Sequence, residues 1–317
     1  MISVLLPYRD AASTIEEALE STLSDLDSGD EVLAVDDRST DEGARIVERI
    51  AARDRRLVPL RSSGEGIVPA LQAALAASRG DLVARMDGDD IVLPGRFAAS
   101  RALFDADPSL AVAAVRVEPF GEVTEGIAHY IEWQNGILTK KEHAASILVE
   151  SPITHPSVTI RRDALAAVGG FTDPPWPEDW DLWLRLSERS FAIAKAPAVH
   201  LRWRRHARTL TTTDARYSME SMVACRAHYL ARRLGDRPFA IWGAGQTGRR
   251  LARALETHDK RPLFFIDIDP KKRMARDRPV LPPEEGLGRG VSIVVAVGQR
   301  GARDIVRARI AGDHILT

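Results

Sequence analysis

Residues 82–90, Leu82-Val-Ala-Arg-Met-Asp-Gly-Asp-Asp90, join a short apolar run to a turn that carries three carboxylates. The run from Leu82 to Met86 has the composition of a buried strand, and glycine and aspartate are common turn residues. Carboxylates crowded into one turn repel one another unless a cation lies among them, and oxygen-only ligands suit Mg²⁺ or Mn²⁺. The alternative is an ordinary solvated turn or a helix N-cap, and this stretch alone leaves both open.

The sequence before this turn alternates strands with helices. Three further strands are predicted at residues 2–6, 31–35 and 57–60, with amphipathic helical segments between them. The tetrapeptide Ser13-Thr-Ile-Glu16 has the form of a capping box, which predicts the start of the first helix. This alternation predicts an α/β fold, a mostly parallel sheet with helices on both faces. Ligands of such sheets bind at the carboxyl ends of the strands, where Asp36-Asp37 and the acidic turn both lie.

Beyond Asp90 the pattern is less regular. Strands are predicted at residues 111–117 and 157–160, and helices at residues 178–188 and 214–234. The segment Leu234-Gly-Asp-Arg-Pro238 has the composition of a linker, and a new strand–helix unit begins at Phe239. A chain of 317 residues is long enough for two domains. We therefore predict one domain over residues 1–234 and a small second α/β domain over residues 235–317.

Composition excludes several classes of protein. The 44 basic and 45 acidic side chains nearly cancel, so no nucleic-acid partner is expected. The one cysteine, Cys225, cannot form an internal disulfide or a cysteine metal cluster, which fits a reducing compartment. No apolar stretch reaches the roughly 18 residues of a membrane span. The sequence predicts a cytoplasmic protein without a transmembrane segment, and leaves peripheral contact with the inner face of the membrane open.

Four motifs occur in a characteristic order along the first two thirds of the chain. They are Ile2-Ser-Val-Leu-Leu-Pro7, Val35-Asp-Asp-Arg-Ser-Thr40, Met86-Asp-Gly-Asp-Asp90 and Pro177-Glu-Asp-Trp-Asp-Leu-Trp-Leu-Arg185, with shorter matches at Leu93-Pro-Gly-Arg-Phe97, Thr154-His-Pro-Ser157, Gly169-Gly-Phe171 and Trp203-Arg-Arg-His206. Over about residues 1–215 the chain resembles the family-two inverting glycosyltransferases, which have a GT-A fold. The resemblance implies metal-dependent transfer of a sugar from a nucleotide-diphosphate donor to a hydroxyl of a glycan or glycolipid acceptor.

The resemblance also implies roles for individual residues. Those in the donor and metal sites are Pro7, Asp36 and Asp37 around the donor base, Asp87 on the ribose or the metal, Asp89 on Mn²⁺ or Mg²⁺, and His206 as a further metal or phosphate contact. One departure lies at Pro7-Tyr8-Arg9-Asp10, where the family usually has a small residue and then Tyr-Asn. Arg9 adds a cation near the expected base pocket, so the base contacts of this chain can differ.

The acceptor hydroxyl is a poor nucleophile and needs a base within hydrogen-bond reach. The resemblance gives this role to Asp179, near the start of the helix predicted from Glu178. Inversion by direct displacement needs no second carboxylate as nucleophile. The alternative is that these two acidic residues only complement the helix macrodipole. If Asp179 is not the base, Glu178 and Asp181 are the next candidates.

Four residues are candidate acceptor or phosphate contacts: His155, Trp176, Glu178 and Arg204. Aromatic rings stack on sugars, and Trp176 lies in a proline-rich turn before the base. Trp180 and Trp183 are three residues apart on one helix, so at least one is expected in the core. A hydrogen-bonded structural histidine is the alternative for His155, and a solvated strand edge is the alternative for Arg204, whose guanidinium could also bind phosphate.

The predicted second domain opens with Gly243-Ala-Gly245-Gln-Thr-Gly248 between a strand and a helix, and Asp267 follows about 20 residues later. These three glycines and Asp267 form a candidate nucleotide site, because the glycines would let a pyrophosphate approach the helix N-terminus. The domain has about half the length of a full dinucleotide-binding domain. It resembles the small Rossmann-like domains appended to sugar-modifying enzymes. A structural role, or homo-oligomerisation through this domain, is the alternative.

Two other functions are alternatives to sugar transfer. A GT-A-like nucleotidyltransferase normally has a glycine-rich phosphate loop after the first strand, and Pro7-Tyr-Arg-Asp-Ala-Ala12 has no glycine. A non-catalytic nucleotide-sugar-binding protein would not need Asp37, Asp89 and Asp179 together. The sequence therefore favours a glycosyltransferase, without naming the sugar, the base or the acceptor.

Overall fold

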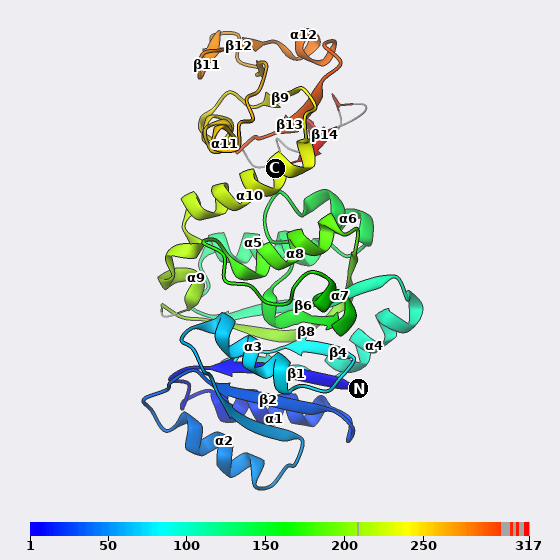
Figure 1. Cartoon of the computed structure of the whole chain (residues 1–317), viewed down its shortest axis with the longest axis vertical. Coiled ribbons are helices and arrows are strands. Elements are labelled where there is room, and N and C mark those ends of the chain that lie inside the picture. Colours follow the sequence, from blue (N-terminus) through cyan, green and yellow to red (C-terminus); the bar gives the residue numbers. More distant parts are fainter. Residues whose placement is uncertain (208, 299–304, 307–308, 311–313, 317) are drawn as a thin grey trace. The chain divides into compact units, whose positions relative to one another are not determined.

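The computed structural model describes residues 1–317 except 208, 299–304, 307–308, 311–313 and 317. The chain divides into two compact units with a sheet each (Figure 1). The first unit comprises Met1–Ala144, Ser151–Pro174 and Glu178–Thr213, and the second comprises Ala145–Glu150, Pro175–Pro177 and Asp214–Thr317. Helix α10 (Met219–Leu234) falls in the second unit, whereas we expected the domain boundary after it. The domain boundary that would allow independent folding stays a prediction.

The first unit is built on an eight-stranded mixed sheet of order β3-β2-β1-β4-β7-β6-β8-β5. Its strands are β1 (Ile2–Tyr8), β2 (Glu31–Asp36), β3 (Leu57–Arg61), β4 (Leu82–Arg85), β5 (Ile91–Val92), β6 (Leu110–Gly121), β7 (Val158–Arg161) and β8 (Ala192–Arg205). The first four are parallel to one another, and β7 runs antiparallel to its neighbours β4 and β6. The predicted α/β architecture is confirmed.

Helices cover both faces of the parallel strands. They are α1 (Ile15–Asp25), α2 (Gly43–Ala51), α3 (Ile67–Ala77), α4 (Arg96–Ala106), α5 (Glu125–Gly136), α6 (Lys140–Ser146), α7 (Arg162–Ala167), α8 (Glu178–Glu188) and α9 (Leu210–Thr213), with a 3₁₀ turn at His155–Ser157. Alternate residues of a strand point to opposite faces. Ile2, Val4 and Leu6 of β1 accordingly share a core with α1, and every residue of β1 is buried.

Helix α1 begins differently from the sequence prediction. The N-cap is Thr14, and no side chain caps the helix, so the expected capping box at residues 13–16 does not form. The hydroxyl of Thr14 instead donates a 3.0 Å hydrogen bond to the carbonyl of Gly88. The Thr14 hydroxyl therefore binds the acidic turn instead of capping α1, which is why the capping box predicted from the sequence does not form.

The second unit has a six-stranded sheet of order β11-β12-β10-β9-β13-β14. Its elements are β9 (Phe239–Trp242), β10 (Phe265–Ile266), β11 (Met274–Ala275), β12 (Arg278–Leu281), β13 (Ser292–Val295), β14 (His314–Leu316), α11 (Gln246–Glu256) and α12 (Pro283–Leu287). All neighbouring strands are parallel except β11 and β12. The helix expected over residues 214–234 is preceded by a 3₁₀ turn at Ala215–Tyr217, because the Ser218 hydroxyl caps α10.

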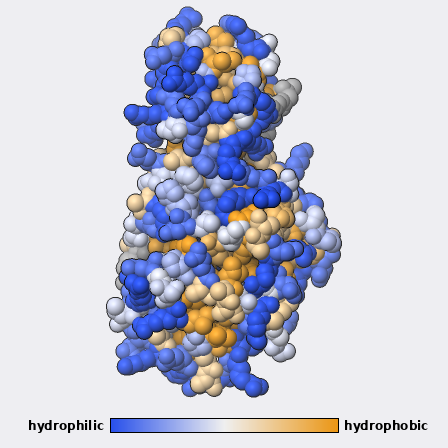
Figure 2. Space-filling view, in the orientation of Figure 1, coloured by the Kyte–Doolittle hydropathy of each residue, from blue (hydrophilic) through white to orange (hydrophobic). Residues whose placement is uncertain are grey.

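Polar side chains dominate the surface in view. Figure 2 shows hydrophilic residues over most of this face of both units, with hydrophobic ones gathered toward the middle of the first. Among the described residues, no helix combines the length and the apolarity that crossing a membrane requires.

Candidate functional site

The strand register brings the two acidic segments to one edge of the first sheet. Tyr8 at the end of β1 pairs with Asp36 at the end of β2, and Leu5 of β1 pairs with Arg85 at the end of β4. The carboxyl ends of these parallel strands therefore meet, with β1 in the middle. This edge is where ligands bind in open α/β sheets.

The expected base pocket contains Asp37, which is 6% exposed. Its carboxylate accepts hydrogen bonds of 2.9 and 3.1 Å from the N–H of Gly66, the residue that precedes α3. Arg9 lies 4.0 Å from the same carboxylate and also pairs with Glu65 at 3.0 Å. The extra cation anticipated from the sequence thus faces Asp37.

Pro7 and Asp36 support this pocket from β1 and β2. Pro7 is buried and pairs with Val35 in the parallel ladder. The Asp36 carboxylate accepts a 2.9 Å hydrogen bond from the N–H of Ser39, which fixes the turn that carries Asp37. The buried Asp36 carboxylate therefore shapes the turn and is not an open binding group.

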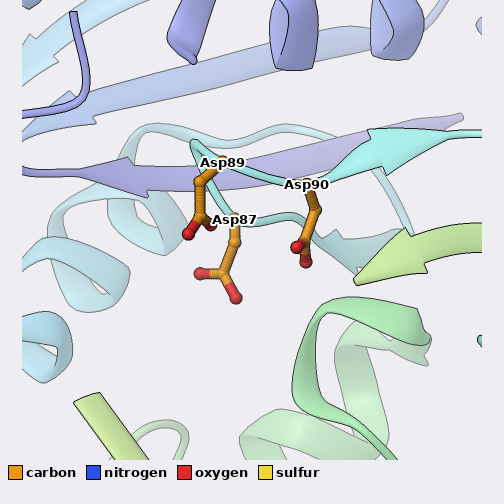
Figure 3. Close-up of side chains that lie close together, drawn as sticks. All are labelled: Asp87, Asp89 and Asp90. Atoms are coloured by element: carbon orange, nitrogen blue, oxygen red, sulfur yellow. The ribbon is translucent and has the colours of Figure 1, made fainter. Parts of the chain in front are cut away.

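The acidic turn after β4 gathers three carboxylates on one side of the backbone (Figure 3). Asp87, Asp89 and Asp90 each offer an oxygen, and these oxygens lie within 4.8 Å of one another. The Nε2 atom of His206 is 3.0 Å from Asp89 Oδ2. The structure therefore assembles Asp87, Asp89 and His206, as the resemblance implied, and adds Asp90.

Burial and mutual repulsion disfavour the charged forms of these carboxylates. Burial is the largest cause that raises the pKa of Asp89, and repulsion from Asp87 adds to it. Burial raises the pKa of Asp90 well above its usual range, and Asp87 and Asp89 raise it further. Within the described part of the chain, Asp90 Oδ2 is buried without a hydrogen-bond partner. Three clustered carboxylates with an unsatisfied oxygen fit a hard divalent cation.

Strand β8 holds the turn in place from the other side. The Arg204 guanidinium donates a 2.6 Å hydrogen bond to the carbonyl of Asp89 and pairs with Glu17 at 2.8 Å. It also lies 4.4 Å from the centre of the Phe120 ring. Arg204 is thereby engaged on three sides, which favours positioning of the turn over direct contact with phosphate.

The expected base, Asp179, lies in the first turn of α8 beside the buried Glu178. Burial, with repulsion from Glu178 as the second cause, raises the pKa of Asp179 to about 7. The carboxylate of Asp181 is held by Arg185 at 2.7 Å and by Thr172 at 3.1 Å. A pKa of about 7 suits Asp179 to proton transfer near neutral pH.

His155 lies against the same helix. Its Nδ1 atom is 3.8 Å from Glu178 Oε1, and its ring meets the edge of Trp183 with centroids 5.7 Å apart. Burial lowers the pKa of His155, although Glu178 opposes the shift. Its Nε2 atom is buried and has no hydrogen-bond partner among the described residues. His155 therefore lies beside Glu178 at the start of α8, with one buried ring nitrogen unpaired among the described residues.

The tryptophans of this region separate into two groups. Trp180 and Trp183 are both 0% exposed, so the expectation that at least one is core is confirmed for both. Trp176 belongs to the second unit, where its ring lies 5.2 Å from that of His228. Its stacking on a sugar stays a prediction.

Sequence reasoning missed two buried arginines that organise the site. Arg85, at the end of β4, donates to Asp87 and also interacts electrostatically with Asp90 and Glu178. Arg96 of α4 donates hydrogen bonds of 2.5 and 2.6 Å to the carbonyls of Arg85 and Pro156. The sequence signal for Arg96 was the short match at residues 93–97, and Arg85 lies within the run predicted as a buried strand. Neither was singled out, because arginine is rarely fully buried.

The glycine motif of the second unit forms the turn between β9 and α11. Gly243 has φ of 123°, and a Cβ atom there would lie 2.3 Å from the carbonyl oxygen of Ala296. A Cβ at Gly248 would lie 1.8 Å from the carbonyl oxygen of Gly243. Asp267 accepts a 2.9 Å hydrogen bond from the N–H of Ala244 and pairs with Lys272 at 2.8 Å. Two of the glycines and Asp267 are therefore needed to build the turn itself.

Solved structures with the same fold bind nucleotide sugars. The S. aureus TarS fragment 1–349 in complex with UDP-GlcNAc aligns with a TM-score of 0.58 at 19% identity, over 81% of this chain and 72% of that one. The mannosyltransferase PcManGT from Pyrobaculum calidifontis, in complex with GDP-Man and Mn²⁺, aligns with a TM-score of 0.52 at 18% identity, over 74% and 62%. At these identities the likeness establishes the GT-A fold.

Curated relatives match more than half of the chain. The amylovoran biosynthesis glycosyltransferase AmsE of Erwinia amylovora is 27% identical over 210 residues, 64% of this chain and 76% of its own length. The UDP-Gal:alpha-D-GlcNAc-diphosphoundecaprenol beta-1,3-galactosyltransferase of Escherichia coli is 26% identical over 184 residues, 56% and 63% respectively. The model of the family described as glycosyl transferase family 2 matches residues 3–169, more than half of the chain. The chain therefore belongs to glycosyl transferase family 2 and is a glycosyltransferase that uses nucleotide sugars.

Proposed function

We propose that the protein transfers a sugar, with inversion at the anomeric carbon, from a nucleotide-diphosphate donor to a hydroxyl of a carbohydrate or lipid-linked acceptor. The observation that carries the proposal is the position of Arg85. This buried cation binds Asp87 of the acidic turn and lowers the pKa of Asp179 on α8. The metal ligands and the base are thus grouped around one fixed charge.

In this proposal the nucleotide is held by the edge of β1 and β2. Asp37 accepts a hydrogen bond from the base, and Pro7 and Asp36 shape its surroundings. Because the Asp37 carboxylate already accepts from the N–H of Gly66, its orientation is set before the donor arrives. Arg9 beside it is available to a base carbonyl oxygen, which would favour a base that offers an acceptor next to an N–H donor.

The acidic turn would hold Mn²⁺ or Mg²⁺ through Asp89, Asp87 and Asp90, with His206 beside Asp89. When bound, the ion would supply a positive charge for the diphosphate leaving group. The protein's own contribution is to fix the carboxylates: Thr14 holds Gly88, and Arg204 holds Asp89 and Asp90.

Asp179 serves as the general base for the acceptor hydroxyl. A carboxylate with a pKa of about 7 is partly ionised at neutral pH and binds a proton more strongly than an ordinary aspartate. Burial raises this pKa, repulsion from Glu178 raises it further, and His155 lies close to Glu178. The base and its two neighbours therefore act as one unit on the acceptor side of the site.

The acceptor is proposed from the relatives. One is named for amylovoran biosynthesis and another for a diphosphoundecaprenol-linked acceptor. We infer a role in cell-envelope polysaccharide biosynthesis, with a glycan or lipid-linked sugar as acceptor. A cytoplasmic location at the inner face of the membrane follows from such an acceptor and stays a prediction.

The test is a screen of UDP-, GDP-, dTDP- and CMP-linked sugars for release of free nucleotide, with Mn²⁺, with Mg²⁺ and with excess chelator. We expect one nucleoside-diphosphate sugar to be turned over, only with metal, and faster when the correct acceptor is added. Analysis of the product by NMR then gives the anomeric configuration. Retention of configuration, or full activity in chelator, would contradict the proposal.

A further inference from the structure

The second unit contains a cationic cavity that sugar transfer does not use. A cavity of about 590 Å³ is lined by Ala244, Gly245, Gln246, Arg249, Arg250, Arg253, Lys272 and Arg276. Five of these eight residues are arginine or lysine and none is acidic. Its volume falls in the range of small-molecule binding sites, about 300–1,000 Å³.

The charges come largely from one face of α11. Gln246, Arg249, Arg250 and Arg253 are spaced at three, four and seven residues, which places them on the same side of a helix. Lys272 pairs with Asp267, and Arg276 pairs with Glu256 at 2.6 Å. Arg250 and Arg253 form no ion pair within 4.0 Å with any residue that the structure describes, and Arg253 interacts with Glu256 only at longer range. Like charges at this spacing repel, so an anion in the cavity would stabilise them.

Gly245 gives a second, independent indication. Gly243 and Gly248 are required by close backbone contacts, but Gly245 is not. Its φ of −80° suits any residue, and a Cβ atom there would meet nothing within 4 Å. Because Gly245 lines the cavity, the missing side chain leaves room at the start of α11. A phosphate group fits this position, since backbone N–H groups and the helix dipole both face it.

We propose that this cavity binds a nucleoside diphosphate, with its two linked phosphates between Gly245 and the arginines of α11. A free phosphate would leave much of the volume empty, and arginines recognise several phosphate oxygens at once. The dinucleotide fingerprint uses its acidic residue on a ribose hydroxyl, whereas Asp267 is already engaged by Ala244 and Lys272. Recognition therefore rests on the phosphates, and the site does not depend on the proposed transfer reaction.

The test uses the full chain in a background where the proposed donor site is disabled by Asp37→Asn and Asp89→Asn, with chelator present. Calorimetry measures the binding of UDP, inorganic pyrophosphate, UMP and NAD⁺. We expect UDP and pyrophosphate to bind with one site per chain and UMP to bind at least tenfold more weakly. No binding of either diphosphate, equal binding of UMP, or NAD⁺ binding tenfold tighter than UDP would overturn the assignment.

Two substitutions in the same background locate the site. Gly245→Ala should weaken diphosphate binding at least tenfold, and Arg250→Ser should weaken it three- to tenfold. The matched controls are Gly288→Ala, where an added Cβ meets only ordinary contacts of 3.6 Å or more, and Arg233→Ser, which removes one exposed charge from α10. Thermal melting verifies that each variant folds. Unchanged affinity in Gly245→Ala and Arg250→Ser would place the diphosphate elsewhere. Because the donor site is disabled, this result is independent of the transfer screen.

Discussion

The backbone N–H of Arg204 donates a 2.7 Å hydrogen bond to Asp90 Oδ1, across 114 residues of sequence. The same arginine donates through its side chain to the carbonyl of Asp89. Two residues later, His206 places its imidazole on the Asp89 carboxylate. The end of β8 therefore fixes the acidic turn through three hydrogen bonds, to Asp89 and Asp90.

The first prediction concerns the metal. Asp89→Asn keeps the size of the side chain and removes one ligand charge, so transfer should fall below detection while the melting temperature changes little. The measurement is nucleotide release at saturating Mn²⁺, alongside thermal melting. Asp236→Asn, the same change at a fully exposed position of the second unit, is the control. Near-normal activity of Asp89→Asn would remove this residue from the metal site.

The second prediction concerns the base. Asp179→Asn removes the proton acceptor, and general-base assistance typically contributes about 10²–10⁴-fold to rate. Turnover should fall by that factor while donor affinity stays within about threefold, because Asp37 and the acidic turn hold the donor. Turnover and calorimetric donor binding are measured on one preparation. If donor binding is lost as severely as turnover, Asp179 belongs to the donor site instead.

The sequence was sufficient for the parallel strands and for the acidic residues at their ends. The strand at residues 2–8 is apolar except for Ser3 and is buried along its whole length, so its sequence pattern has one interpretation. The α8 bounds, Glu178–Glu188, agree with the predicted range for a similar reason, since a strong amphipathic pattern follows a proline-rich turn.

Contacts between distant segments could not be predicted. Strand β8 (Ala192–Arg205) contains a proline and several charged residues, so its sequence shows only a weak strand pattern. It nevertheless pairs with β6 along its whole length. The burial of Arg85 depends on Asp87 and on elements that follow much later in the chain. Thr14 illustrates the same limit, because its bond to Gly88 overrides the local capping signal.

The third prediction is a pH dependence. A base with a pKa of about 7 must be ionised to act, so kcat/KM should rise with pH through about 7 and then level off. Glu178→Gln removes the like charge that raises the pKa of Asp179, so the midpoint should move to lower pH. The profile is measured at fixed ionic strength for both proteins. A Glu178→Gln midpoint equal to or above that of the wild type would contradict this coupling.

The fourth prediction concerns the buried cation. Arg85→Met leaves Asp87 and Asp90 without their buried partner, and breaking a buried ion pair costs about 3–5 kcal/mol. The free energy of unfolding should fall by that order in chelator. Adding Asp87→Asn should recover part of the loss, because one unpaired charge is removed. A double-mutant cycle by urea unfolding measures the coupling. Strictly additive effects of Arg85→Met and Asp87→Asn, with the Asp87→Asn single variant measured as well, would show that the pair contributes no coupling energy.

The last prediction concerns Lys195 in β8. Its side chain is buried, with 4% of its surface exposed. Its Nζ atom donates to the carbonyls of Gln134 and Pro152. Burial, assisted by Arg116, lowers the pKa of Lys195 to about 7. The nearby His143 is also buried, and its pKa is lowered to about 3, so it stays neutral above pH 7 and adds no titration there.

Between pH 7 and the ordinary lysine range, the unfolded chain holds a proton that folded Lys195 has released. The free energy of unfolding should therefore rise with pH in this window, by up to about 1.4 kcal/mol per pH unit from this group. Lys195→Met keeps the apolar stem and removes the titration, so its slope between pH 7 and 9 should be lower. Urea unfolding at pH 7, 8 and 9 measures both slopes, with the exposed Lys141→Met as the control. Parallel slopes for Lys195→Met and the wild type would mean that Lys195 remains charged in the folded protein, held by the two carbonyls.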